Sequence, residues 1–384
     1  MELFFNYVFA IMQPFTKDGW KVLSLIALFF MFKNYFIWKK DKIVLSFVIF
    51  LVYGFVICLF SPNISVAFKD FSDYFIGWLF SFLIGYSITD EKNKTNLLKV
   101  YIFVFAFTIF CGYLAYFGII PEDIGFYHFI EDYGGERRLA VFDWPTIFSA
   151  RCLFVITILL TLLFYIKNNK FKFVTLLITC LYFIYALSLS GTRTCYFALF
   201  LIVIVMSIFF CIKKKVKIYM ALLLCSLMII PCIYVYFFNP TIKNRINRID
   251  IKKDYSITSR IQLYKFALEL IKEKPLFGYS PKVGISKHEE LGYLNVFHNI
   301  YLNIMVDFGI IGFILFILIF YNIFKRLFFL YKQTKSVYYL MLIFAWSSIL
   351  VADNFDCFLK SAFFSGQCFW ITGLILGGTS DKNT

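Results

Sequence analysis

The chain has 384 residues, of which 61 % are hydrophobic and only 16 % charged, and its mean hydropathy is +0.78. A soluble domain is about half apolar and about a quarter charged, so this composition excludes a soluble protein and predicts a chain that stays in the bilayer. The net charge of +15 does not indicate nucleic-acid binding, because the basic residues are spread over the loops between apolar segments. The ten cysteines include no CxxC pair and predict neither a disulfide framework nor a metal site.

Apolar segments long enough to cross a membrane follow one another along the chain. A spanning helix needs about 20 mostly apolar residues. Such segments are predicted at 22–38, 43–60, 74–88, 100–120, 147–166, 173–189, 195–212, 218–238, 300–324, 337–351 and 362–376. The segment 3–15 is shorter, and is either a brief first span or an interfacial helix. Residues 1–15 lack a basic n-region and a cleavage site, so we expect no cleavable signal. The predicted fold is an all-α polytopic membrane protein with about 11–12 transmembrane helices and no internal repeat.

Short loops rich in lysine fall on alternate connections between the predicted spans. Short loops rich in Lys and Arg remain in the cytoplasm, so the lysine-rich set predicts which side is cytoplasmic. Both termini then lie on that side as well, if 3–15 is counted as a span. We predict three regions: an N-terminal transmembrane bundle at 1–238 with an outer loop at 121–145, a large extracytoplasmic loop with an amphipathic helix at 239–299, and C-terminal transmembrane helices at 300–384.

Arginine is distributed differently from lysine. Seven of the eight arginines fall on or near the predicted outer side, and Arg326 is the exception. Guanidinium is always charged and offers a planar fork that matches phosphate oxygens, so the bias predicts an anion site on the outer side. The alternative is pairing with outer-loop carboxylates such as Glu131, Asp132 and Glu136. The outer arginines are Arg137, Arg138, Arg151, Arg193, Arg245, Arg248 and Arg260.

The long outer loop contains a predicted amphipathic helix. Thr258 and Ser259 can cap its start, apolar residues then recur at helical spacing from 261 to 271, and Pro275 and Gly278 end it. Arg260 would lie in the first turn, where the helix dipole also favours an anion. An ordinary surface arginine is the competing interpretation.

Two further positions stand out near the predicted outer boundary. Ser-Gly-Thr-Arg193-Thr joins two spans with almost no loop, which predicts that Arg193 is either a functional residue or a snorkelling anchor. His298 stands where the outer loop re-enters the membrane, and histidine suits proton transfer at neutral pH, although a lone histidine is often structural. Asp307, Asp353 and Asp356 could each orient His298 or pair with an arginine. A metal site built from His128, His288 and His298 has no supporting motif.

These motifs, in this order, resemble the O-antigen ligase and polymerase superfamily. The resemblance is carried by Ser-Gly-Thr-Arg193, Thr-Ser-Arg260, Pro-Leu-Phe-Gly-Tyr at 275–279, His298-Asn-Ile-Tyr and Gly-Ile-Ile-Gly at 309–312, with a looser match at 138–145. It covers the chain from about residue 137 to residue 312. Each motif is short, and their order and spacing make the match specific.

The resemblance implies a glycosyltransferase of the GT-C type in the bacterial inner membrane, with its active site facing the periplasm. It implies an undecaprenyl-pyrophosphate-linked oligosaccharide as donor, a lipid-linked repeat unit or lipid A-core as glycan acceptor, and no metal or other cofactor. Arg193 and Arg260 would bind the pyrophosphate and His298 would serve the acceptor. We predict that further residues bind the pyrophosphate or the glycan, and we consider a chain-length regulator protein as an additional partner. These further residues are Arg137, Arg138, Arg151, Arg245, Arg248, Tyr264, Asn299 and Asp353.

Several functions remain open at this point. A polymerase passes the glycan to another lipid-linked repeat unit, whereas a ligase passes it to lipid A-core, and we favour the polymerase because no feature marks recognition of lipid A-core. A lipid-linked oligosaccharide flippase is a more distant alternative. Such transporters typically show paired repeats and charges near the midplane, whereas these spans show no repeat and most of the charged residues lie outside them. A non-enzymatic scaffold is more distant still.

Overall fold

The computed structural model describes residues 2–15, 41–121, 128–130, 136–166, 169–213, 255–287 and 296–379, with single positions at 233, 237 and 243. The predicted span 22–38 and nearly all of the predicted span 218–238 lie outside these residues, as do Arg245 and Arg248. The division of the chain into three regions therefore stays a prediction.

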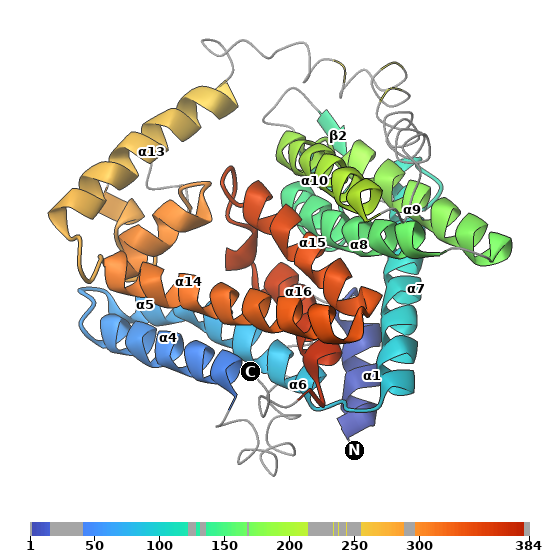
Figure 1. Ribbon diagram of the computed structural model, residues 1–384. Coiled ribbons are helices and arrows are strands. Elements are labelled where there is room, and N and C mark those ends of the chain that lie inside the picture. Colours follow the sequence, from blue (N-terminus) through green and yellow to red (C-terminus); the bar gives the residue numbers. More distant parts are fainter. Residues whose placement is uncertain are drawn as a thin grey trace.

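Helices account for nearly all of the described structure (Figure 1). Six of them are long and apolar enough to cross a membrane, and three shorter apolar helices accompany them. The six are α4 (Lys42–Leu59), α7 (Glu91–Tyr116), α8 (Pro145–Tyr165), α9 (Lys170–Ser190), α10 (Arg193–Ile212) and α14 (Ile300–Thr334). The three are α1 (Glu2–Met12), α15 (Val337–Ala352) and α16 (Ala362–Leu376). The predicted all-α membrane fold is confirmed.

The remaining elements are too short, too irregular or too polar to count among these apolar helices. The predicted span 74–88 is divided, because α5 (Ile64–Tyr74) runs into a π-helix (Phe75–Phe80) and then into α6 (Ser81–Tyr86). Outside the predicted spans lie α13 (Tyr255–Glu273), the 3-10 turns Ile285–Lys287 and Phe358–Lys360, and a small antiparallel hairpin. The hairpin pairs β1 (His128–Ile130) with β2 (Glu136–Arg138), and His128 lies opposite Arg138.

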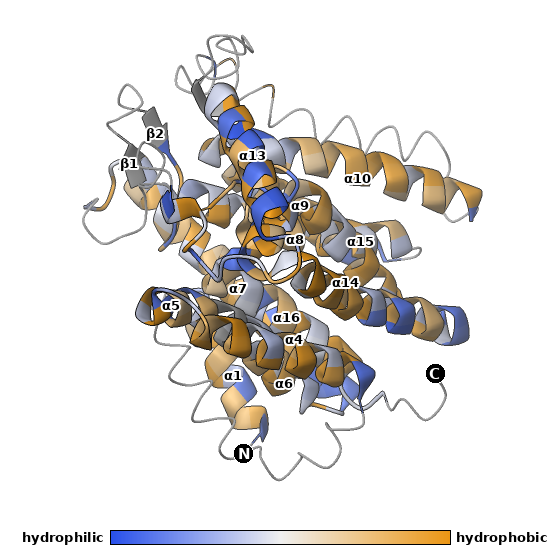
Figure 2. Cartoon of the chain, turned by 90° about the vertical axis from the view of Figure 1, so that its left-hand side faces the viewer, coloured by the Kyte–Doolittle hydropathy of each residue, from blue (hydrophilic) through white to orange (hydrophobic). Residues whose placement is uncertain are grey.

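Helix α8 forms the centre of the bundle. It packs against α9, α10, α15 and α16 and is buried on nearly every side. In contrast, α4 and α10 expose rows of apolar side chains, such as Val52 and Phe55 on α4 and Phe200 on α10. Figure 2 shows these two helices as largely hydrophobic and α13 as rich in hydrophilic residues. Apolar outward faces of this kind suit contact with lipid.

Small residues allow the close contact between α6 and α16. A Cβ atom on Gly85 would lie 2.2 Å from the Trp370 carbonyl oxygen, and one on Gly373 would lie 2.0 Å from that of Phe82. The two backbones can approach only because both positions lack a side chain, as is typical of helix pairs in membranes.

Helix α14 is broken at Gly309, whose φ of 65° and ψ of −171° are not helical. The loop after α13 fills the break: the Tyr279 N–H donates to the Val306 carbonyl at 2.8 Å, and the Ile310 N–H donates to the Pro275 carbonyl at 2.8 Å. A Cβ on Gly309 would lie 2.2 Å from the Leu276 carbonyl oxygen. The Pro-Leu-Phe-Gly-Tyr and Gly-Ile-Ile-Gly motifs are thus two sides of one backbone contact.

Contacts across the bundle define its two ends. At one end, which we call the lysine end, the residues 41–42, 86–94, 322–336 and 377–379 meet. At the other, the arginine end, the residues 60–62, 138–149, 189–193, 278–287, 296–300 and 353–362 meet. The predicted grouping of the lysine-rich loops agrees with this arrangement.

The exceptional Arg326 is explained by a buried cluster at the lysine end. Its guanidinium pairs with the Asp41 carboxylate and donates to Tyr86 Oη at 3.0 Å and to Thr379 Oγ1 at 3.0 Å. Asp41 also caps α4, accepting the Ile43 N–H at 2.8 Å. The planar guanidinium reaches these three partners from two separate nitrogens, Nη1 and Nη2, whereas the ammonium of a lysine is a single donor centre. Arg326 is therefore structural.

Candidate functional site

His298 lies at the arginine end, in the turn that leads into α14. Its φ of 50° places it in the left-handed region, which non-glycine residues seldom adopt. Asn299 caps the helix by accepting the Leu302 N–H at 3.0 Å, and its amide donates to the Asn354 carbonyl at 2.9 Å. The Ile300 N–H donates to the Asp353 carbonyl at 3.0 Å. These bonds fix the His298 turn against the turn between α15 and α16.

The His298 ring is held by Asp356 from that second turn. His298 Nδ1 lies 3.1 Å from Asp356 Oδ1, which also accepts the Cys357 N–H at 2.9 Å. Burial alone would raise the pKa of the Asp356 carboxyl, but its contacts with His298, Arg260 and the Cys357 N–H hold that pKa below its ordinary value. Asp356 is therefore ionised at neutral pH. An ionised carboxylate accepts a hydrogen bond from Nδ1–H, and this tautomer leaves the lone pair of Nε2 to accept a proton from a substrate.

Arg260 completes this cluster from α13. One of its terminal nitrogens, Nη2, lies 4.0 Å from Asp356 Oδ2, close enough for charge attraction but too far for a hydrogen bond. Its side chain is 26 % exposed and that of His298 is 31 % exposed, so both groups reach solvent. Arg260 thus keeps donors that an anion could occupy.

Tyr264 anchors α13 beside His298. Its hydroxyl lies 2.9 Å from the His298 carbonyl and 3.2 Å from the Asn354 carbonyl, so it can donate to either. The prediction that Thr258 and Ser259 cap this helix is wrong, because α13 already begins at Tyr255. Arg260 therefore lies in the second turn, and the helix dipole contributes less there than we expected.

Arg193 is the first residue of α10 and is partly buried. Gly191 makes the sharp turn before it possible with a φ of 66°. One turn into the helix, the ring of Phe197 packs edge-on against that of Phe355, with 5.8 Å between the centroids. The start of α10 thus lies against the turn that carries Asp356. That Arg193 and Arg260 bind the same pyrophosphate stays a prediction.

Arg138 lies beneath the Arg193 turn and is almost fully buried. Its Nε donates to the Ser190 carbonyl at 2.7 Å and its Nη2 donates to Thr192 Oγ1 at 3.1 Å. Ser149 of α8 adds a hydroxyl 2.5 Å from Ser190 Oγ and 2.7 Å from Thr192 Oγ1. The guanidinium of Arg138 therefore supports the turn that presents Arg193.

Two other members of the predicted set are buried away from any substrate surface. Arg151 is fully buried in α8, where its Nε donates to Gln367 Oε1 at 3.0 Å and its guanidinium lies 4.0 Å from the centre of the Phe363 ring. Asp353 is also fully buried, and its Oδ1 accepts the Phe358 N–H at 2.7 Å. Burial raises the pKa of the Asp353 carboxyl well above its ordinary value. Arg137 is in β2, and only its backbone is described.

Sequence reasoning did not single out Lys360. Its Nζ lies 2.8 Å from Asp70 Oδ2 and 3.3 Å from Asp307 Oδ2, and Asn303 donates to the same Asp307 oxygen at 2.6 Å. This buried ion cluster fastens the end of the turn that carries Asp356 to α5 and α14. Its place in the short turn between two predicted spans, close to two aspartates of the same turn, was the signal that could have identified it.

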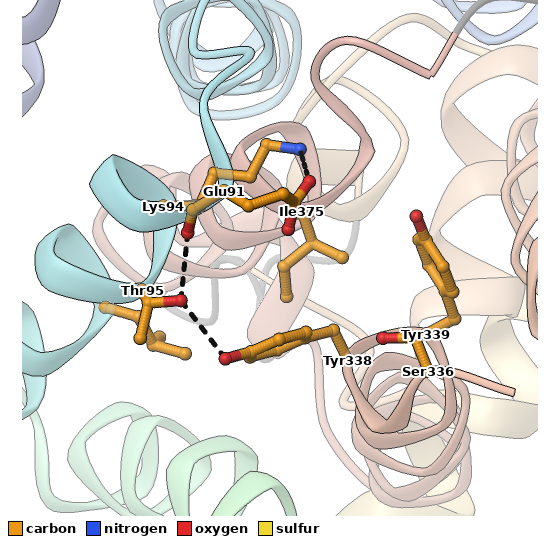
Figure 3. Close-up of a pocket in the computed structure, with 8 residues that line it drawn as sticks. Glu91, Lys94, Thr95, Ser336, Tyr338, Tyr339 and Ile375 are labelled. Atoms are coloured by element: carbon orange, nitrogen blue, oxygen red, sulfur yellow. Dashed lines mark hydrogen bonds and ion pairs between the residues drawn. The ribbon is translucent and has the colours of Figure 1, made fainter. Parts of the chain in front are cut away.

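Within the described residues, no group of three or more His, Cys, Asp or Glu side chains could hold a metal ion. A small cavity of about 20 Å³ lies at the lysine end, between α7 and α15 (Figure 3). There Lys94 pairs with Glu91 at 2.6 Å, and Thr95 Oγ1 lies 3.1 Å from Tyr338 Oη. A cavity of this volume holds about one water molecule, so it is no site for a glycan.

Comparison with known proteins identifies the segment that carries these residues. Residues 178–317 match the family described as O-antigen ligase. No curated protein matches the chain. The matched segment contains Arg193, Arg260 and His298, and it confirms the resemblance to the O-antigen ligase and polymerase superfamily. Members of this family are glycosyltransferase-like polymerases and ligases.

Proposed function

We propose that this protein is a bacterial cell-surface polysaccharide polymerase, for O-antigen or capsule, of the GT-C type. It transfers a glycan from undecaprenyl pyrophosphate to a sugar hydroxyl of another lipid-linked repeat unit. The observation that carries the proposal is the cluster of His298, Asp356 and Arg260, which lies at the arginine end of a membrane bundle. Two of these residues belong to the segment that matches the O-antigen ligase family.

The chemistry requires a base and a place for negative charge. The acceptor hydroxyl attacks the anomeric carbon, a new C–O bond forms there, and the bond to the pyrophosphate oxygen breaks. His298 Nε2 takes the hydroxyl proton, and Asp356 stabilises the resulting imidazolium through Nδ1. Undecaprenyl pyrophosphate leaves with the bonding electron pair. A single displacement of this kind inverts the anomeric centre.

Arg260 and Arg193 would stabilise the departing pyrophosphate. Preorganised guanidinium groups can stabilise charge that develops on a phosphate oxygen, and removing one such donor typically costs about 10²–10³ in rate. Arg260 already lies within 4.0 Å of a carboxylate beside His298, so its group is close to the proposed reacting atoms. Arg193 would approach from α10, on the turn that Arg138 and Ser149 support.

The arginine end would face the periplasm. The supporting argument is the set of short lysine-rich loops at the opposite end, which is typical of cytoplasmic loops. Single cysteines that replace Lys287 and Lys332 in a background without reactive cysteines test this orientation. We expect an impermeant maleimide to label position 287 and not position 332 in intact inner-membrane spheroplasts. The reverse pattern would place the site on the cytoplasmic side.

The second candidate function is ligation to lipid A-core, which the description of the matched family favours. Both reactions use the same donor site, so the acceptor must distinguish them. We propose to reconstitute the purified protein with the lipid-pyrophosphate donor and to offer either a lipid-linked repeat unit or lipid A-core. If the protein is a polymerase, the lipid-linked repeat unit should yield longer lipid-linked chains and lipid A-core should yield no product. His298→Ala should abolish either product, and flipping without transfer would favour a transporter.

A further inference from the structure

A second cavity lies at the arginine end, separate from the His298 cluster. It has a volume of about 660 Å³ and lies between the outer end of α4 and the loop that follows α13. Figure 1 shows both elements on the left-hand side of the bundle. Most of its surface is apolar, and the residues around it include Tyr53, Val56, Phe60, Lys274, Leu276 and Tyr279.

The cavity opens among side chains that face lipid. Phe60 is 84 % exposed and directly follows the row of exposed apolar residues on α4, and Leu276, on the opposite wall of the cavity, is 54 % exposed. An apolar hollow at the end of a spanning helix meets hydrocarbon, and a hydrocarbon chain can enter it without losing hydrogen bonds to water. Its chemistry therefore fits the chain of a membrane lipid.

Positive charge lies at one side of this cavity. The segment 273–287 carries three lysines and one glutamate. That glutamate, Glu273, is occupied by Lys287 at 3.5 Å and by the hydroxyl of Tyr279. Within the described residues, no carboxylate lies within 4.0 Å of Lys274 Nζ, which sits 4.6 Å from the centre of the Tyr279 ring. Lys274 is available to a lipid phosphate.

The distance between Lys274 and the reacting groups indicates which of the two lipid-linked substrates could place its phosphate at Lys274. Arg260 and Lys274 are fourteen positions apart on one continuous helical stretch, which is about 20 Å at 1.5 Å per residue. A donor must place its pyrophosphate directly at the reacting anomeric carbon. An acceptor must place only its hydroxyl there, and its own phosphate lies several sugars away. A phosphate at Lys274 therefore suits the acceptor and not the donor.

We propose that this cavity holds the polyprenyl chain of the acceptor, with the acceptor pyrophosphate at Lys274. The inference rests on the proposed polymerase function, because a polymerase takes two lipid-linked substrates. It adds an acceptor lipid site to the donor site at Arg193 and Arg260. The acceptor glycan would run along α13 from Lys274 to His298.

Kinetics with the two lipids varied separately test this site. Lys274→Glu reverses the charge, and Val56→Trp fills the cavity. We expect each variant to raise KM for the acceptor by about tenfold or more, as for the loss of one charge-assisted contact, and to leave KM for the donor within about twofold. The matched controls Lys272→Glu on exposed α13 and Val52→Trp on the lipid-facing side of α4 should leave both constants unchanged. An equal rise in donor KM, or no rise for the acceptor, would overturn the proposal.

Photo-crosslinking tests the same site without turnover. An acceptor analogue with a diazirine in its polyprenyl chain should label peptides from α4 and from residues 274–280, and Val56→Trp should reduce this labelling. Equal labelling by a diazirine phosphatidylglycerol at the same concentration would show a pocket for bulk lipid and would refute the assignment. Because labelling needs no catalysis, an inactive wild-type protein that is still labelled specifically would count against the polymerase function and not against the site.

Discussion

Replacing Asp356 by Asn tests whether the carboxylate prepares His298 as a base. The ring nitrogen Nδ1 lies 3.1 Å from Asp356 Oδ1, and the Asp356 side chain is only 8 % exposed. An amide in this place can donate to Nδ1, which would leave the proton on Nε2, the nitrogen that must accept the hydroxyl proton. Asp356→Asn thus removes both the required tautomer and the charge that stabilises imidazolium.

The expected magnitude follows from the role of the base. General acid–base catalysis contributes about 10²–10⁴-fold, and the imidazole itself is still present in the variant. We expect kcat to fall by about 10²–10³-fold, which corresponds to roughly 3–4 kcal/mol of transition-state stabilisation. Because Asp356 acts through His298, KM for donor and acceptor should stay within about twofold. The assay is initial-rate transfer by purified protein in liposomes.

Asp353→Asn is the matched control for this experiment. Asp353 is buried three residues earlier, and burial raises the pKa of its carboxyl well above the ordinary value, which favours the uncharged form. An amide can replace a neutral carboxyl and still accept the Phe358 N–H at the position of Oδ1. We expect activity within about threefold of wild type, because the amide oxygen keeps the bond from the Phe358 N–H and burial already disfavours a charge at this position. Full activity in Asp356→Asn, or an equal loss in both variants, would refute the reasoning about His298.

Three other substitutions test the surrounding structure. Arg326→Gln leaves the buried Asp41 carboxylate without its ion pair and should lower the free energy of unfolding by about 3–5 kcal/mol, as measured by thermal unfolding in detergent. The double variant Arg326→Gln with Asp41→Asn should recover part of this loss. Gly309→Ala places a Cβ 2.2 Å from a carbonyl oxygen and an alanine at a φ of 65°, so it should lower the melting temperature clearly. In the control Gly118→Ala, the new Cβ meets nothing within 4 Å, so the melting temperature should fall only by the cost of the backbone strain. Arg138→Lys loses one of two bonds to the Arg193 turn and should lower kcat about tenfold at unchanged protein level, as compared by fluorescence size-exclusion. Unchanged melting in the first two variants, or unchanged kcat in the third, would contradict these interpretations.

Much of the fold could be predicted because spanning helices have a strong compositional signal. The described helices α4, α8, α9, α10, α15 and α16 each lie within a few residues of a predicted span. The break in α14 could not be predicted, because a glycine is common in membrane helices and the loop that fills the break is about thirty residues earlier. The π-helix at Phe75–Phe80 likewise has no local sequence signal.

The candidate site was predicted in part. Arg260 and His298 were identified from residue type and position, and the structure brings both to the same carboxylate. The sequence did not choose between Asp353 and Asp356, because both occupy one short turn and the choice depends on how that turn folds. Asp353 points inward to the Phe358 N–H, and this leaves Asp356 for His298. Arg326 was an unexplained exception for a similar reason, since its partner Asp41 is 285 positions away.

Substituting lysine for the two arginines tests the proposed transfer reaction most directly. Lysine keeps the positive charge and loses the planar fork, so one of two phosphate hydrogen bonds disappears. The measurement is in vitro transfer by purified Arg193→Lys and Arg260→Lys with the lipid-pyrophosphate donor, no added metal and equal protein levels. We predict that each variant loses about two orders of magnitude in rate. Near-normal transfer by both variants would contradict pyrophosphate stabilisation by these guanidinium groups.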